Sequence, residues 1–125
     1  MSNAAKSLFV FGIYLLFLGM VLIFVPNLLL RSFGFAETTE IWIRVIGVLV
    51  IILGFYYFLA ARVELTDLFR WSVPARGSVI FFFAAFVVLG LAPPVLLIFG
   101  VVDLAAAIWT ALALKSDGAK QLGKT

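Results

Sequence analysis

Four long runs of apolar residues, separated by short polar segments, dominate the hydrophobic pattern of the chain. They cover residues 8–25, 41–61, 74–92 and 95–114. Each run is close to the roughly 20 residues that a helix needs to cross the hydrocarbon core of a bilayer. In lipid the backbone must satisfy its own hydrogen bonds, so such runs form helices. The pattern therefore predicts an all-α protein, a four-helix transmembrane bundle in which residues 1–125 form one domain.

Prolines mark the ends of two of these runs. Pro26 closes the first run, since proline disfavours helix in the residue before it. The pair Pro93-Pro94 separates the third and fourth runs, and so short a connection predicts antiparallel neighbours. Residues 28–35, LLLRSFGF, place apolar residues around Arg31. They form either a short helix in the outer interface or an extension of the first span, and the sequence leaves both open.

The composition excludes several classes of function. Hydrophobic residues make up 66% of the chain and charged residues 12%, whereas a soluble domain carries about 25% charged residues. The chain has no cysteine and no histidine, which excludes thiol oxidoreductases, histidine-ligated haem and zinc sites built on these residues. The basic residues are dispersed, which argues against nucleic acid as a partner. We expect neither a cofactor nor a metal.

Lysine and arginine are distributed unequally between the two sides of the predicted bundle. If the spans alternate, one side carries seven basic residues and the other side two. The richer side holds Lys6, Arg62, Arg70, Arg76, Lys115, Lys120 and Lys124, and the poorer side holds Arg31 and Arg44. Cytoplasmic segments carry the excess of basic residues. We therefore expect cytoplasmic N- and C-termini in a multi-pass protein.

Glycines predict how the helices pack. Gly12 and Gly19 lie seven positions apart in the first span, and Gly47 and Gly54 lie seven apart in the second. That step keeps both glycines on one helix face, and close backbone approach favours helix association in lipid. We expect these faces, and Gly100 in the fourth span, to be packing grooves. The likeness of the first two spans would also fit an inverted repeat, but the last two spans do not continue it.

One acid, Asp103, lies within the fourth apolar run. An ionised carboxylate at the bilayer centre costs about 2.5–3.5 kcal/mol, so such residues usually face the bundle interior and pair. Arg44, near the start of the second span, is the candidate cation, at a depth offset of roughly 7–8 Å. The alternative pairs Arg44 with Glu40, one turn earlier. Asp103 is either structural or a site for a proton, a cation, a headgroup or a quinone.

Aromatic residues gather in the cytoplasmic halves of the predicted spans. The candidates for lining a ligand cavity are Tyr14, Tyr56, Tyr57, Trp109 and Thr110. The alternative interpretation is an aromatic belt with rings that face lipid. No phosphate-binding glycine loop and no nucleophile elbow occurs in the sequence, so no catalytic residue is predicted.

The second span resembles a known family. Residues 44–62, RVIGVLVIILGFYYFLAAR, combine an arginine, spaced glycines and a closing Ala-Ala-Arg. In this they resemble the second span of small bacterial four-helix membrane proteins of the DoxX-like type. The preceding VPNLLLRSFGF is similar to the first outer loop of those proteins. The resemblance covers the first half of the chain and implies a compact bundle in the cell inner membrane. Some relatives are accessory subunits linked to quinone-dependent oxidation.

Three hypotheses for function follow from the sequence. The first is a non-enzymatic structural or accessory subunit of the inner membrane. Its partners would be the lipid bilayer and either a second copy or a membrane complex. The second is a small proton-coupled transporter or channel that uses Asp103; small multidrug exporters have a similar length but carry their key acid in the first span. The third is a lipid or quinone binder that uses the cytoplasmic-half aromatics.

Overall fold

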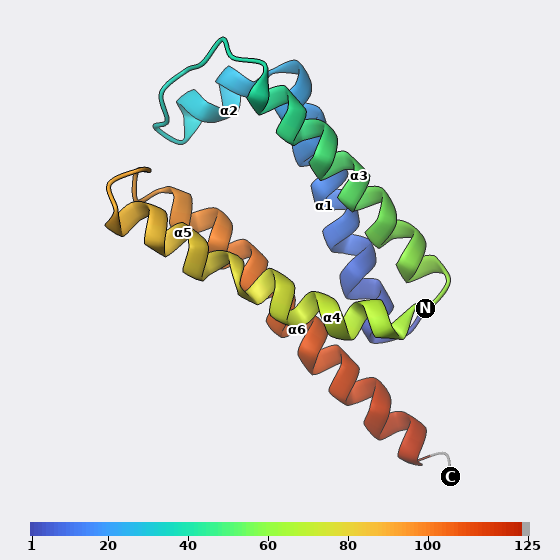
Figure 1. Cartoon of the computed structure of the whole chain (residues 1–125). Coiled ribbons are helices and arrows are strands. Elements are labelled where there is room, and N and C mark those ends of the chain that lie inside the picture. The colour runs from blue at the N-terminus through green and yellow to red at the C-terminus, as the bar shows by residue number, and fades with distance from the viewer. Residues whose placement is uncertain (124–125) are drawn as a thin grey trace.

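The computed structural model describes residues 1–123, and all the regular structure in that range is helical (Figure 1). The helices are α1 (Asn3–Phe24), α2 (Pro26–Ser32), α3 (Trp42–Arg62), α4 (Thr66–Gly77), α5 (Val79–Val88) and α6 (Leu96–Gly123). Four helical stretches, α1, α3, α4 with α5, and α6, are long and apolar enough to cross a membrane. The predicted all-α class and its four long apolar helices are therefore confirmed.

The third span differs from the sequence prediction at its start. Helix begins at Thr66 rather than near residue 74, and Pro74 lies inside α4. Proline removes one backbone N–H from the helix. A helix tolerates this where nearby polar groups satisfy the carbonyl that the missing N–H would have bonded. Ser78 has right-handed helical angles, φ −73° and ψ −20°, so α4 and α5 run on as one rod. At the C-terminal side, α6 likewise continues past residue 114 to Gly123.

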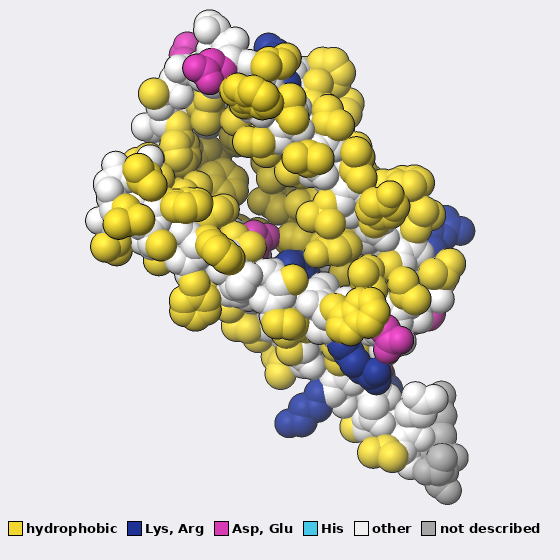
Figure 2. Space-filling view, in the orientation of Figure 1, with side chains coloured by type: hydrophobic (Ala, Val, Ile, Leu, Met, Phe, Trp, Pro, Cys, Tyr) yellow, Lys and Arg dark blue, Asp and Glu magenta, His cyan; other side chains and the backbone are white. Residues whose placement is uncertain are grey.

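The long helices form two pairs that diverge from a common base (Figure 1). One pair is α1 with α3, and the other is α5 with α6; α4 and α1 both pack on α6 at the base. We call this base the closed end and the opposite, diverging side the open end. The buried apolar core lies at the closed end and consists of Ala4, Ala5, Leu8, Phe11, Leu15, Tyr57, Ala60, Ala61, Phe69 and Ala113. Figure 2 shows a hollow in the surface between the two pairs.

Glycines bring α1 and α3 into backbone contact. A Cβ atom on Gly54 would lie 2.9 Å from the carbonyl oxygen of Gly12, and a Cβ atom on Gly12 would lie 3.0 Å from that of Gly54. Gly19 and Gly47 face each other in the same way, at 2.8 and 2.9 Å. Gly100 lies in similarly close contact with α5. The glycine faces predicted from the spacing thus lie at helix contacts.

Acidic side chains hold the N-terminal residues at the closed end. The backbone N–H and the hydroxyl of Ser2 donate to the Glu64 carboxylate, at 2.6 and 2.7 Å. The backbone N–H groups of Asn3 and Ala4 donate to the Asp117 carboxylate of α6, at 3.2 and 2.9 Å. Asp117 therefore acts as a capping acid for α1 although it lies on a different helix, where its charge also complements the helix dipole.

A short helix and an aromatic contact border the open end of the hollow. Pro26 occupies the first turn of α2, where its missing N–H costs nothing. Residues 28–32 thus belong to a separate short helix rather than to an extension of the first span. The ring centre of Phe33, directly after α2, lies 5.1 Å from the ring centre of Phe99 in α6. This contact between the segment after α2 and α6 borders the open end, where the two helix pairs themselves stay apart.

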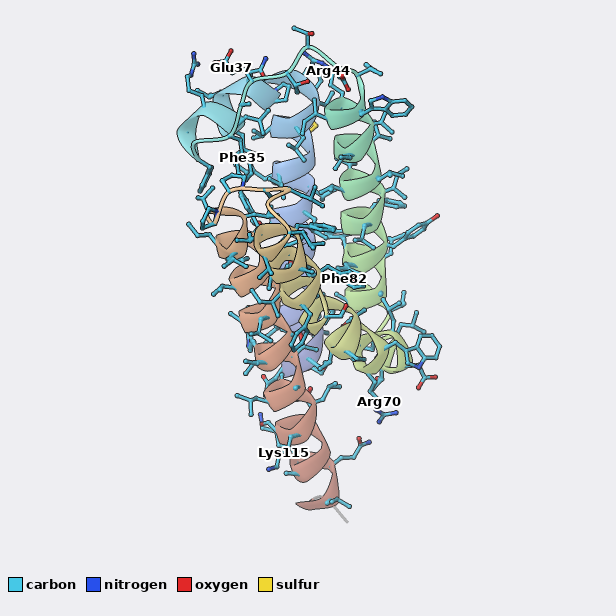
Figure 3. The ribbon with its side chains drawn as sticks, turned by 60° about the vertical axis from the view of Figure 1, so that its left-hand side comes forward. Phe35, Glu37, Arg44, Arg70, Phe82 and Lys115 are labelled. Atoms are coloured by element: carbon cyan, nitrogen blue, oxygen red, sulfur yellow. The ribbon has the colours of Figure 1, made fainter. Side chains whose placement is uncertain are left out.

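Charged side chains gather at the two ends of the molecule. Figure 3 shows Glu37 and Arg44 at the open end, and Arg70 and Lys115 at the closed end. Hydrophobic side chains cover most of the surface between these ends (Figure 2). This distribution is typical of a protein whose middle lies in hydrocarbon and whose ends lie in water.

Candidate ligand site between the helix pairs

Arg76 lies in the last turn of α4 and is only 4% exposed. Its Nη2 donates to the hydroxyls of Ser72, at 3.0 Å, and Thr110, at 2.8 Å. The guanidinium carbon lies 4.9 Å from the ring centre of Phe11 and 5.9 Å from that of Tyr57, which gives it two cation–π contacts. The sequence places Arg76 near the entry of the third span, among the basic residues of the richer side, whereas the structure encloses it among the helices.

A chain of hydroxyl groups continues from this arginine to α1. Thr110, fully buried on α6, accepts from Arg76, and its Oγ1 lies 2.7 Å from the Oγ of Ser7. The Ser7 hydroxyl in turn donates to the carbonyl of Ala4, at 2.7 Å. If Thr110 donates to Ser7, the hydroxyl protons of Thr110 and Ser7 each have one acceptor. The chain of hydrogen bonds joins α4, α6 and α1.

One donor of this otherwise satisfied group has no partner. The Nη1 of Arg76 is buried and makes no hydrogen bond within the described residues. Leaving a buried donor of a charged group unsatisfied is costly, so this nitrogen calls for an explanation. Asp103, half-buried on α6, interacts electrostatically with Arg76, but no direct ion pair joins them in residues 1–123. Figure 2 shows acidic and basic side chains together at the floor of the hollow.

An apolar cavity adjoins these polar groups. Its volume is about 250 Å³, it is open on one side, and it is lined by Val10, Phe11, Tyr14, Val102, Ala105, Ala106 and Trp109. Phe11 carries the Arg76 guanidinium on its ring, and Tyr14 lies within electrostatic range of Asp103. The cavity therefore has apolar walls, and Phe11 and Tyr14 are the wall residues that connect it to these polar groups.

The aromatic candidates from the sequence divide between this site and the outer surface. Tyr14 and Trp109 line the cavity. Tyr57 is buried against the Arg76 guanidinium, and Thr110 accepts a hydrogen bond from that guanidinium. Tyr56, in contrast, is 60% exposed on the outer face of α3. The structure thus brings together all of these candidates except Tyr56.

Arg44 and Asp103 do not pair. Arg44 lies at the open end of α3, and its Nη1 donates to the backbone carbonyl of Ile23 in α1 (Figure 3). Neither Asp103 nor Glu40 forms an ion pair with Arg44 in the part of the chain that the structure describes. The reason is that α3 packs on α1 rather than on α6, and a helical arginine leans towards its own N-terminus. The cation that interacts electrostatically with Asp103 is Arg76.

Three residues of the site were not predicted as such, namely Ser7, Ser72 and Arg76. Their common signal is depth, because the first, third and fourth spans each carry small hydroxyl or charged residues near the closed end. Ser72 and Arg76 are also four positions apart, a spacing that places them on one helix face. Polar residues at the same depth in separate spans predict a shared hydrogen-bond network, because lipid offers no water as an alternative partner.

In the described residues no group of three Asp or Glu side chains could hold a metal ion. Comparison of the chain with models of known protein families, with curated proteins and with solved structures finds no match. The function must therefore be inferred from the chemistry of the site itself.

Proposed function

We propose that this chain is a small, non-enzymatic, multi-pass membrane protein that binds a lipid-soluble amphiphile between its two helix pairs. The observation that carries the proposal is the buried, unpartnered Nη1 of Arg76, whose guanidinium lies on the ring of Phe11 in the wall of an apolar cavity. A polar group of a ligand would satisfy this donor and remove its desolvation cost. The hydrocarbon of the same ligand would lie along the cavity walls and continue into the bilayer through the open side.

We further propose that both termini face the cytoplasm in a cell inner membrane. Arg76 is buried and no longer counts as a surface charge. The remaining basic residues still favour the closed end, which holds Lys6, Arg62, Arg70, Lys115 and Lys120, over the open end, which holds Arg31 and Arg44. This asymmetry supports a cytoplasmic closed end.

An accessory subunit is the second candidate function. It rests on the resemblance of residues 44–62 to DoxX-like proteins, which is itself a proposal. Proton-coupled transport through Asp103 is less well supported, because the acid faces a buried arginine rather than standing alone in the hollow. A stable complex that co-purifies in mild detergent would favour the accessory role over ligand binding.

The lipid content of the purified protein tests ligand binding. Protein isolated in mild detergent should retain an amphiphile that is enriched over the bulk membrane lipids, as measured by lipid extraction and mass spectrometry. Tyr14→Leu, in the cavity wall, should lower this enrichment at least about tenfold, since it removes aromatic contact area and a polar hydroxyl from the site. Tyr56→Leu is the matched control on the outer face of α3 and should leave it unchanged. Recovery of bulk lipids alone would refute ligand binding.

A further inference from the structure

A second cavity lies at the closed end, between the start of α1 and the last turns of α6 (Figure 1). Its volume is about 420 Å³, and it is open on one side. That volume is within the range of about 300–1,000 Å³ that is usual for ligand pockets. Apart from Met1, every residue that lines it is polar or charged. We call this cavity the polar pocket.

The polar pocket carries an excess of positive charge. Lys6 of α1 and Lys120 of α6 line it, and neither forms an ion pair within residues 1–123. The one acid of the lining, Asp117, already accepts from the Asn3 and Ala4 amides with its two carboxylate oxygens. The pocket therefore offers two unpaired ammonium groups, which suit an anionic ligand.

The polar pocket and the apolar cavity lie along the same two helices, which pack on each other. On α1, Asn3 of the pocket is seven positions before Val10 of the cavity. On α6, Lys120 of the pocket is eleven positions after Trp109 of the cavity. Steps of seven and eleven residues return to nearly the same helix face. The two cavities therefore belong to one surface channel, which we call the α1–α6 groove.

The α1–α6 groove crosses the boundary between water and hydrocarbon. Lys6 directly precedes the apolar run of residues 8–25, and Lys120 lies beyond the end of the run 95–114. At 1.5 Å per residue, Val10 lies about 6 Å deeper than Lys6, and Trp109 about 16 Å deeper than Lys120. The polar pocket is thus at the depth of lipid headgroups, and the apolar cavity is at the depth of acyl chains.

We infer that the α1–α6 groove binds an anionic phospholipid, with its phosphate between Lys6 and Lys120 and an acyl chain in the apolar cavity. This inference rests on the function proposed above and adds the class of the amphiphile. Lysine binds phosphate as a point charge. A zwitterionic phospholipid would bring its own ammonium group close to the two lysines, and these like charges repel.

Quenching of Trp109 fluorescence measures binding in the groove. In a Trp42→Phe, Trp71→Phe background, Trp109 is the only tryptophan of the chain and lines the apolar cavity. The protein is placed in phosphatidylcholine nanodiscs that contain increasing fractions of a lipid with brominated acyl chains, either phosphatidylglycerol or phosphatidylcholine. A lysine near an anionic lipid favours binding by about fivefold. Brominated phosphatidylglycerol should therefore reach half-maximal quenching at a fraction at least about tenfold below that of brominated phosphatidylcholine.

Lysine variants test whether the phosphate lies in the polar pocket. Lys6→Gln and Lys120→Gln should each raise the half-maximal fraction of phosphatidylglycerol by about fivefold, because each removes one cation. Both lysines are exposed, so the changes leave the buried core intact. Lys115→Gln is the matched control, since Lys115 is exposed on the same helix but does not line the pocket. It should change the half-maximal fraction by less than about twofold.

Inorganic phosphate distinguishes a lipid headgroup from a soluble anion. It is added in excess over the brominated lipid and compared with chloride at equal ionic strength, which screens charges to the same extent. The half-maximal fraction of phosphatidylglycerol should be the same in both salts, because soluble phosphate gains nothing from the apolar cavity. If phosphate alone removes the preference for phosphatidylglycerol, the pocket is a site for a soluble anion, and the lipid inference is overturned.

The outcomes separate this inference from the proposed function. Saturable quenching by phosphatidylglycerol that is weakened by both pocket variants, but not by Lys115→Gln, supports both. If the two lipids saturate at the same fraction, or if all three lysine variants act equally, the cavity still binds an amphiphile. The proposed function then stands, and the anionic headgroup site is overturned. If neither lipid gives saturable quenching, ligand binding at the cavity fails, and this inference fails with it.

Discussion

At the scale of single residues, the most informative feature is Arg76, a charged side chain enclosed in a bundle with very few buried polar groups. Its partners are hydroxyls and aromatic faces rather than a directly bonded carboxylate. Removing one hydrogen-bond partner of a buried charged group lowers the free energy of unfolding more than removing an exposed hydrogen bond of the same geometry does. The stability of the closed end therefore depends on the hydroxyls around Arg76.

Thr110→Val tests this dependence. Valine keeps the shape of threonine but removes the acceptor of Arg76 and the hydroxyl that meets Ser7. We expect a loss of about 1–3 kcal/mol in the free energy of unfolding, measured by denaturation in detergent. Thr39→Val, at an exposed position in the loop before α3, is the control and should change it by less than about 0.5 kcal/mol. Equal losses for the two variants would contradict the role given to Thr110.

At the scale of elements, backbone contact between α1 and α3 replaces the hydrophobic driving force that a soluble bundle would use. Lipid is as apolar as the side chains, so association depends on close packing and on small residues that allow it. Gly12 with Gly54 and Gly19 with Gly47 provide two such contacts, and the separation of the glycines along each helix matches. This pair of helices forms the first wall of the hollow.

Gly54→Ala measures how tight this contact is. In an open helix the change would stabilise by about 0.5–1 kcal/mol. At this position the new methyl group would meet the backbone of α1, with the Gly12 oxygen at 2.9 Å and the Leu16 nitrogen at 3.1 Å. Overpacking of this kind costs about 1–3 kcal/mol, so we expect a net loss of stability on denaturation in detergent.

Gly118→Ala is the matched control for this substitution. Gly118 is also helical, but a Cβ atom there would meet nothing within 4 Å. The free energy of unfolding of the Gly118→Ala protein should stay unchanged or rise slightly. A Gly54→Ala protein that is as stable as Gly118→Ala would show that α1 and α3 lie farther apart than the structure has them.

A second contact between elements is the cap that Asp117 of α6 places on the N-terminus of α1. Asp117→Ala removes the acceptor of the Asn3 and Ala4 amides and should cost about 0.5–2 kcal/mol of local stability. Hydrogen exchange at these two amides should rise in proportion. Asp67→Ala, in the first turn of α4, loses only an exposed ion pair and should leave exchange in α1 unchanged. Unchanged exchange in Asp117→Ala would contradict the cap.

At the scale of the whole molecule, the structure is two helix pairs joined at one end and separated at the other. The joined end holds the core, the N-terminal residues and the arginine network, whereas the separated end is bordered by α2 and the contact of Phe33 with Phe99 (Figure 1). The core, the N-terminal residues and most of the basic residues lie at the closed end. The two ends therefore differ, and the orientation in the membrane decides which of them faces the cytoplasm.

Single cysteines test this orientation, since the natural chain has none. We compare Thr39→Cys at the open end with Val63→Cys and Ala119→Cys at the closed end, all at exposed positions. In intact cells a membrane-impermeant maleimide should label only Thr39→Cys, and after lysis it should label all three. Labelling of Val63→Cys and Ala119→Cys from outside would invert the proposed orientation, and opposite results for these two would contradict the fold.

The sequence predicts the helices and the glycine contacts more reliably than the partners of the charges. The runs around Gly12 and Gly54 predict both helices and packing faces, because the spacing of residues along one helix sets which of them share a face. Arg44 and Asp103 show the opposite case. Their pairing required α3 and α6 to be neighbours, and the depth of each residue along its own span contained no information about that. The same holds for Arg76, whose enclosure depends on how α4 packs.

Apolar helices of membrane-spanning length could be predicted before the fold was known, because hydropathy and helical hydrogen bonding are local properties of the chain. Which polar groups meet depends on the packing of the helices: Arg76 rather than Arg44 interacts electrostatically with Asp103, and Ser7 and Thr110 complete one network. The physical reason is that in lipid a polar group must find its partner on a neighbouring helix, and the choice of neighbour is made by packing across the whole bundle.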